Sequence, residues 1–169
     1  ILADDQQLRG IRLLYITPLR ALSRDLSLAI REPIEAMGWP IRVGIRNGDS
    51  SSSERTKQLK APPQILVTTP ESLALLLSNA KADELFGQLE TVILDEWHEL
   101  MGSKRGSQTE LCLSWLRQLR PQLQTWAISA TIGNLEQAAR HALGTASEPQ
   151  LIGGAPARST EIQLSLIHI

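Results

Sequence analysis

The stretch VILDEWHELMGSKRG, residues 92–106, places a short β-rich apolar run directly before two adjacent carboxylates. The three apolar residues 92–94 are typical of a buried strand. Asp95 and Glu96 follow at once, although like charges repel each other and burying a charge is costly. We therefore expect a positively charged partner at the end of this strand.

The composition of the 169 residues is that of one globular domain without a charge bias. Hydrophobic residues make up 42%, charged residues 21%, and the formal net charge is -1. A neutral chain has no global basic field, so any nucleic-acid binding must come from local groups. The lone Cys112 excludes an intramolecular disulfide and a cysteine metal cluster. No apolar run approaches the roughly 20 residues of a membrane span, so we expect a cytoplasmic protein without a membrane partner.

Several runs share the strand-like composition of this stretch. The expected strands are residues 11–16, 41–45, 64–68, 91–95 and 125–129. Between them, three segments carry apolar residues at helical spacing: Leu22, Leu26, Ala29 and Ile30; Leu73, Leu76 and Leu77; and Leu111, Cys112, Trp115, Leu116 and Leu119. This alternation predicts an α/β fold, a parallel sheet with helices on both faces. Ligands of such sheets bind at the carboxyl ends of the strands.

Helix-start signals follow several of these strands. Thr69–Glu71 fits an N-cap, a proline at the first helical position and an acid in the first turn. Ser51–Glu54 fits a capping box, and Asn134–Gln137 is a weaker version. Pro33 is expected to kink or end the first long helix, and Gly38 to close it. Helix N-termini bind phosphates without many lysines, although each signal alone is also an ordinary cap.

The chain divides into one domain and two short segments. We expect a domain over residues 1–147 and a Pro/Gly-rich linker towards a missing second domain over 148–163. The last six residues, 164–169, resemble translated sequencing-adapter sequence more than native protein. Because residue 1 is isoleucine, we expect the chain to be a fragment.

The acid pair is suited to phosphoryl transfer. One carboxylate can hold a divalent cation through its waters, and the other can orient or deprotonate an attacking water. Mg²⁺ would need substrate phosphates to complete a site with only Asp95 and Glu96. The alternative is an exposed pair at a strand-to-helix turn, where Glu96 and Glu99 favour the helix N-terminus. A metal-dependent nuclease would need a third ligand, for which Glu99 is the only nearby candidate, and His98 has no second histidine at helical spacing.

The residues carry a family resemblance. DEWH, Asp95–His98, resembles the DExH box of superfamily 2 helicases, and its context with WAISATIGN is similar to the Lhr-like group, particularly the ligase-associated DEXH helicases. In chain order, Thr17–Leu22 resembles motif Ia, Gly48–Asp49 with Glu54–Arg55 the GD and ER segment, Thr69–Leu73 motif Ib, and Ser129–Thr131 motif III. The resemblance covers roughly residues 11–144. It implies the first RecA-like P-loop NTPase motor domain, N-terminally truncated.

The resemblance implies ATP and Mg²⁺ as cofactors and gives the site residues their roles. Asp95 would hold Mg²⁺ through water, and Glu96 would activate the hydrolytic water. His98 would relay the nucleotide state to the coupling segment Ser129, Ala130 and Thr131. The implied nucleic-acid contacts are Thr17, Pro18, Arg20, Gly48, Asp49, Thr69, Pro70 and Glu71. We add Lys104 and Arg105 as extra phosphate contacts, although a solvated basic turn fits them equally well.

The implied function is a fragment of an ATP-dependent DNA helicase of DNA repair or recombination. Its partners would be DNA, as single strands and duplex junctions, with a DNA ligase and a nuclease. The chain contains no GxxxxGK[ST] loop and no Gly-Lys pair, so we expect no ATPase activity from this polypeptide alone. Two alternatives stay open, an RNA helicase and a non-catalytic nucleic-acid-binding module, because motifs that face the backbone discriminate poorly between sugars.

Overall fold

The computed structural model describes residues 10–130, 133–144 and 148–153. Within them lies one parallel sheet in the order β2-β3-β1-β4-β5. The strands are β1 Leu13–Ile16, β2 Val43–Arg46, β3 Ile65–Thr68, β4 Thr91–Leu94 and β5 Gln124–Ala127. Each of the five expected runs forms a strand, with bounds shifted by one or two residues. The α/β fold with a parallel sheet is therefore confirmed.

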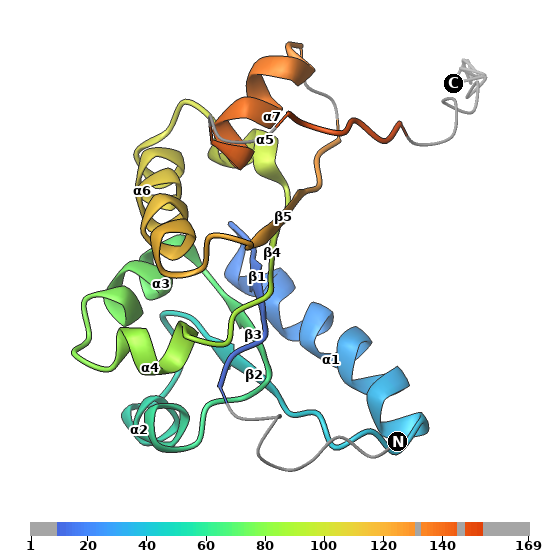
Figure 1. The fold of residues 1–169 in the computed structure, drawn as a ribbon. Helices are drawn as coiled ribbons and strands as arrows, with labels where there is room; N and C mark the ends of the chain where they lie inside the picture. The colour runs from blue at the N-terminus through green and yellow to red at the C-terminus, as the bar shows by residue number, and fades with distance from the viewer. Residues whose placement is uncertain (1–9, 131–132, 145–147, 154–169) are drawn as a thin grey trace, which may run out of the picture.

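Helices cover the two faces of this sheet unequally. They are α1 Arg20–Ala36, α2 Ser52–Lys60, α3 Pro70–Leu77, α4 Ala82–Phe86, α5 Trp97–Leu100, α6 Lys104–Leu119 and α7 Leu135–Leu143. In Figure 1, α1 runs along one side of the sheet, and α3, α4 and α6 lie on the other. The short α5 and α7 lie together near the ends of β4 and β5. Among the described residues, no helix combines the length and the apolar character that crossing a membrane requires.

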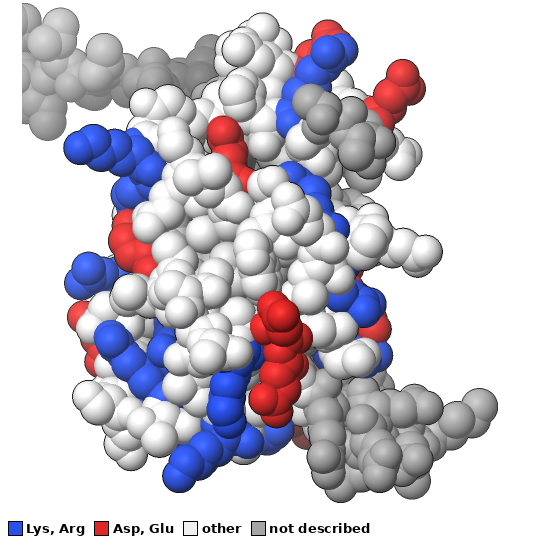
Figure 2. Space-filling view, turned by 60° about the vertical axis from the view of Figure 1, so that its left-hand side comes forward, with Lys and Arg blue, Asp and Glu red and all other residues white. Residues whose placement is uncertain are grey.

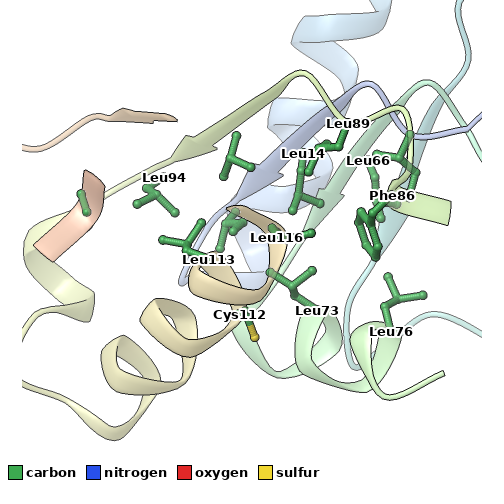
Figure 3. Packing of buried hydrophobic residues seen from close by; sticks show 14 of the residues in the cluster. Leu14, Leu66, Leu73, Leu76, Phe86, Leu89, Leu94, Cys112, Leu113 and Leu116 are labelled. Carbon is green, nitrogen blue, oxygen red and sulfur yellow. The ribbon is translucent and has the colours of Figure 1, made fainter. Parts of the chain in front are cut away.

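The larger core lies between the sheet and α3, α4 and α6 (Figure 3). Its fully buried members include Leu14 and Leu66 from the sheet, Leu73 from α3, Phe86 from α4 and Leu113 from α6. A smaller cluster under α1 is built on Ile34, Val43 and Val67. Apolar side chains on both faces of the central strands explain why these strands read as continuous hydrophobic runs.

The buried face of α1 agrees in part with the expected one, because Leu26 and Ile30 pack against the smaller cluster. Leu22 is 38% exposed, and Ala29 is also exposed. Ser23, Ser27 and Ile34 are the buried residues of this helix. Small side chains at the two serine positions let the helix approach the sheet closely, and Ser23 returns its hydroxyl hydrogen bond to the Leu19 carbonyl at 3.4 Å.

Pro33 does not end α1, which continues to Ala36. Gly38, with φ of 63°, follows the helix in the left-handed conformation expected of a closing glycine. β5 is an edge strand of the sheet, and Trp126 on it is 53% exposed. Ile128, just beyond the end of β5, is 50% exposed.

The five strands end in one row. Ile16 is paired in register with Thr68 on one side and with Leu94 on the other. Thr68 is in turn aligned with Arg46, and Leu94 with Ala127. The residues that follow each strand are therefore brought to the same edge of the sheet, which is the usual place for ligands in this architecture.

Candidate nucleotide and nucleic-acid site

The acid pair lies directly beyond the end of β4. The backbone N–H of Asp95 continues the sheet by donating to the Ile16 carbonyl at 2.8 Å. Glu96 then turns away from the strand with φ 46° and ψ 46°, and it is the only non-glycine residue with positive φ among the described residues. Oδ1 of Asp95 accepts from the N–H of Glu96 at 3.0 Å, which supports this strained turn. The two side chains are partly exposed, so neither carboxylate is buried without water.

The expected positive partner is not a lysine or arginine. Among the described residues, neither Asp95 nor Glu96 forms an ion pair with such a side chain; the only ionic neighbour is His98, whose Nδ1 lies 3.4 Å from Oε2 of Glu96. Hard carboxylate oxygens are the donors that Mg²⁺ prefers. The described residues contain no group of three or more His, Cys, Asp or Glu that could hold a metal alone. The pair therefore fits Mg²⁺ only when phosphate oxygens complete the ligand set.

Tyr15 is a neighbour of the pair that the sequence reasoning missed. It lies on β1 in register with Ile93, and its phenol is close enough to Asp95 to respond to the charge of that carboxylate. Burial, followed by the charge of Asp95, raises the pKa of Tyr15 to about 12. The phenol therefore keeps its proton at neutral pH and carries no charge that would compete with Asp95 for a cation. Nothing in the local sequence marks this contact, because it depends on strand order.

The DEWH turn is bound to the segment that follows β5. Nδ1 of His98 lies 3.0 Å from Oγ of Ser129, with the direction of the hydrogen bond set by the imidazole tautomer. The Trp97 backbone N–H donates to the Ile128 carbonyl at 3.0 Å, and its indole Nε1–H donates to Ala138 of α7, also at 3.0 Å. The contact between His98 and Ser129 is the placement that the coupling role requires. That role itself stays a prediction.

The rest of the expected coupling segment is less constrained. Ala130 is exposed, and Thr131 lies outside the described residues. Asn134 caps α7 by accepting from the Gln137 N–H at 3.1 Å, as the sequence predicted. The ends of β4 and β5 therefore form one connected unit with α5 and α7.

The loop after β2 is held from within. Arg55 donates three hydrogen bonds to it, from Nε to the Ser50 carbonyl at 2.9 Å and from Nη2 to the carbonyls of Asn47 and Gly48 at 3.2 Å each. The predicted capping box is present, since the Ser51 and Glu54 side chains each accept a hydrogen bond from the other's backbone N–H. The backbone N–H groups of Asn47, Asp49 and Ser50 also donate within the loop, so the loop is held by its own hydrogen bonds.

Arg20 brings the first helix to this loop. Its guanidinium lies 3.7 Å from Oδ1 of Asp49, and its Cζ would be 2.8 Å from a Cβ added to Gly48. Both charged side chains are more than 60% exposed, so the pair itself contributes little to stability. The absence of a side chain at Gly48 leaves room for Arg20 to lie across the loop.

The remaining expected nucleic-acid contacts divide into buried and exposed residues. The buried ones are Thr17, Pro18, Thr69 and Pro70. Thr69 is the N-cap of α3 and Pro70 its first residue, as predicted, although the Thr69 hydroxyl makes no capping hydrogen bond to the backbone. Glu71, Lys104 and Arg105 reach the surface, and Arg105 is paired with Glu71. Contacts to a bound strand would therefore come from these exposed side chains and from the loops' backbone, while the buried residues shape the loops.

The surface around α3, α4 and α6 has no single-sign field. In Figure 2, lysine and arginine side chains lie beside aspartate and glutamate, with uncharged surface between them. This agrees with the net charge of -1. Binding to a polyanion on this face would depend on placed backbone and side-chain donors more than on bulk charge.

Comparisons with known proteins agree with this geometry. The sequence profile of the DEAD/DEAH box helicase family matches residues 1–138. The ATP-dependent helicase Lhr-Core of Methanothermobacter thermautotrophicus is 39% identical over 153 residues, which cover 85% of this chain and 18% of that protein. The chain thus spans about a fifth of the length of the relatives it matches.

Two solved structures are similar at the level of the fold and the sequence. The Mycobacterium smegmatis helicase Lhr bound to single-stranded DNA and AMP-PNP superposes with a TM-score of 0.71 at 39% identity, covering 82% of this chain and 19% of that one. The DUF1998 helicase MrfA bound to DNA and AMPPNP has a TM-score of 0.71 at 28% identity, covering 85% and 20%. On the profile match and these identities, the chain belongs to the DEAD/DEAH box helicase family and, within it, to the Lhr-type helicases.

Proposed function

We propose that the chain forms part of the first motor domain of an ATP-dependent DNA helicase. In this proposal, Mg-ATP hydrolysis at the DEWH turn is coupled to translocation along a single strand and to duplex unwinding during DNA repair. The observation that carries the proposal is that the proposed hydrolysis residues and the proposed coupling segment are in contact at one edge of the sheet. Asp95 and Glu96 lie beyond β4, and His98 joins their turn to Ser129 beyond β5.

The two carboxylates of the acid pair would have different roles in ATP hydrolysis. Asp95, held by its backbone hydrogen bond to β1, would orient a hydrated Mg²⁺ that neutralises charge on the phosphates. Glu96, which is partly exposed, would accept the proton of the attacking water. A change at the phosphates would reach Ser129 through His98, which contacts both Glu96 and that serine.

DNA is the proposed track because the Lhr and MrfA structures that this chain resembles hold DNA. In this proposal the exposed, positively charged side chains of Arg20 and Lys104 would contact phosphates and not bases. Contacts of this kind tolerate any sequence, which a translocating motor needs. A DNA ligase and a nuclease are proposed as cellular partners on the resemblance alone, and co-purification from native extract with the tagged full-length protein tests them.

The proposed catalytic unit is larger than these 169 residues. They contain no GxxxxGK[ST] loop to cradle the phosphates, and they match a fifth or less of the length of the relatives. We therefore expect the purified chain to hydrolyse no ATP with Mg²⁺ and single-stranded DNA present. Turnover by the chain alone, abolished by Glu96→Gln, would contradict this part of the proposal.

The decisive experiment uses the full-length protein that contains the chain. Glu96→Gln should lower DNA-stimulated ATP hydrolysis by about 100-fold or more, because the base is lost, while AMP-PNP and DNA binding persist. Glu84→Gln in α4, an exposed carboxylate at the opposite end of the strands from the site, is the matched control and should leave hydrolysis unchanged. Unwinding of sequence-matched DNA and RNA duplexes distinguishes the DNA helicase from an RNA helicase. Full hydrolysis by Glu96→Gln would remove Glu96 from its proposed role.

A further inference from the structure

Arg105 joins two parts of the candidate nucleic-acid edge that are far apart in sequence. It lies in the first turn of α6, and its Nε donates to Oε1 of Glu71 at 2.5 Å. Its Nη2 donates to Oε2 of the same carboxylate at 3.4 Å and to the backbone carbonyl of Pro18 at 2.8 Å. One guanidinium therefore connects the loop after β1 with the first turn of α3, across sequence separations of 87 and 34 residues.

The contact between Arg105 and Glu71 is ionic. Burial raises the pKa of Glu71, but the hydrogen bond from Arg105, together with a backbone hydrogen bond, the charge of Arg105 and the Thr69 hydroxyl, brings it below its usual value. The carboxylate is therefore ionised at neutral pH, and it balances the charge of the guanidinium. Lys104, the preceding residue, is exposed and forms no ion pair within the described residues. The charge of Arg105 is thus paired with a carboxylate, whereas the charge of Lys104 has no such partner among the described residues.

The backbone that carries Arg105 is itself fixed. Oγ of Ser103 accepts from the Gly106 N–H at 3.1 Å and donates to the Leu100 carbonyl at 2.6 Å. Only residues 101–103 separate α5 from α6. The guanidinium is therefore held at a set distance from the DEWH turn. Its fork geometry suits a carboxylate and a carbonyl at the same time, which a lysine could not reproduce.

We infer that Arg105 is a positioning residue for nucleic-acid binding, which holds the loop after β1 and the start of α3 at the spacing that one phosphate backbone requires. The inference rests on the proposed function. Fixing two contact segments before binding lowers the ordering cost that binding would otherwise include. The direct phosphate contact expected from the sequence is the competing role, and it predicts different behaviour for Glu71. If Arg105 bound phosphate directly, Glu71 would be its competitor; if Arg105 positions the loops, Glu71 is its necessary partner.

The test is a double-mutant cycle on binding of fluorescein-labelled oligothymidylate to the full-length protein that contains the chain, followed by fluorescence anisotropy at several salt concentrations. Arg105→Gln and Glu71→Gln should each weaken binding about fivefold, and the double variant should be no weaker than either single variant. The slope of log affinity against log salt should stay as in the unmodified chain for both. Arg105→Lys should recover only part of the affinity.

Lys104→Gln is the matched comparison, because it removes the neighbouring charge without touching the Glu71 pair. If Lys104 is a direct contact, its loss reduces the salt slope by about 0.7. Tighter binding by Glu71→Gln, together with a reduced salt slope for Arg105→Gln, would overturn the positioning role in favour of direct contact. Unchanged binding by both single variants would also overturn it. Failure of the unmodified full-length protein to bind oligothymidylate at all would instead count against the proposed function, and circular dichroism of each variant confirms that the fold is retained.

Discussion

Gly106→Ala should destabilise the protein through a collision with backbone atoms. Gly106 is buried in the first turn of α6, directly over the end of α5. A Cβ at this position would overlap the carbonyl oxygen of Leu100 and lie 2.9 Å from its carbonyl carbon. Because these are backbone atoms, no rotamer change relieves the overlap, and the turn between the two helices has to move.

The magnitude follows from two opposing effects. Alanine gains up to about 1 kcal/mol of helix propensity over glycine, less in a first turn. Overpacking a rigid site costs about 1–3 kcal/mol and occasionally more. We expect a net loss of about 2 kcal/mol in the free energy of unfolding. With a urea m-value of about 2 kcal/mol/M, the midpoint should fall by about 1 M.

Two other glycines supply controls for this measurement. Gly102 has φ of 70° and nothing within 4 Å of an added Cβ, so its change to alanine should cost about 1 kcal/mol from backbone strain alone. Gly133 has neither a positive φ nor a close neighbour, and its alanine variant should keep the original stability. The assay is urea unfolding followed by circular dichroism at 25 °C. A Gly106→Ala protein as stable as Gly133→Ala would refute the steric reasoning.

Three further predictions concern single side chains. Trp97→Phe removes the buried hydrogen bond to the Ala138 carbonyl, so we expect the free energy of unfolding to fall by about 1–3 kcal/mol. Relative to the unmodified chain, amide exchange should become faster in α7 but not in α3. An equal change in both helices would argue against a specific role of this hydrogen bond in holding α7. Tyr15 is the only tyrosine, so the absorbance of tyrosinate reports on it directly and should rise with a midpoint near pH 12 in the folded chain and near 10 in guanidinium. Because the pKa of Tyr15 is higher in the folded chain than in the unfolded chain, its contribution to stability is complete below about pH 10 and is lost as the pH rises towards 12. A midpoint near 10 in the folded chain would contradict the burial of Tyr15 beside Asp95. Burial raises the pKa of Cys112 to about 11, so iodoacetamide at pH 8 should label it slowly until urea unfolds the chain, and rapid labelling of folded protein would contradict its burial.

The fold was predictable where the signals are local. Apolar β-rich runs gave the strands, and the capping box at Ser51 and the N-cap at Asn134 gave two helix starts, because each depends on residues within four positions of one another. The buried face of α1 was predictable only in part from apolar spacing, which gave Leu26 and Ile30. Ser23 and Ser27 are buried because their small side chains let the helix approach the sheet, whereas Leu22 is exposed. Side-chain size, and not hydrophobicity, therefore decides which of these residues face the sheet.

The candidate site was predictable only in its outline. The order of motifs along the chain pointed to one sheet edge, because parallel strands bring their carboxyl ends together. The contacts of Tyr15 with Asp95 and of Arg105 with Pro18 depend on strand order and helix packing, and nothing near these residues in the sequence marks them. The left-handed conformation of Glu96 also has no sequence signal, because glutamate is not a residue that favours it.

That conformation has a consequence for how this position can change over time. With φ of 46°, Glu96 occupies a backbone state in which glycine or asparagine would be more stable by about 1 kcal/mol. Selection for stability alone would therefore drive the carboxylate out of the sequence. If Glu96 is the proposed base, stability and chemistry oppose each other at this residue, and interactions elsewhere in the domain offset the backbone strain.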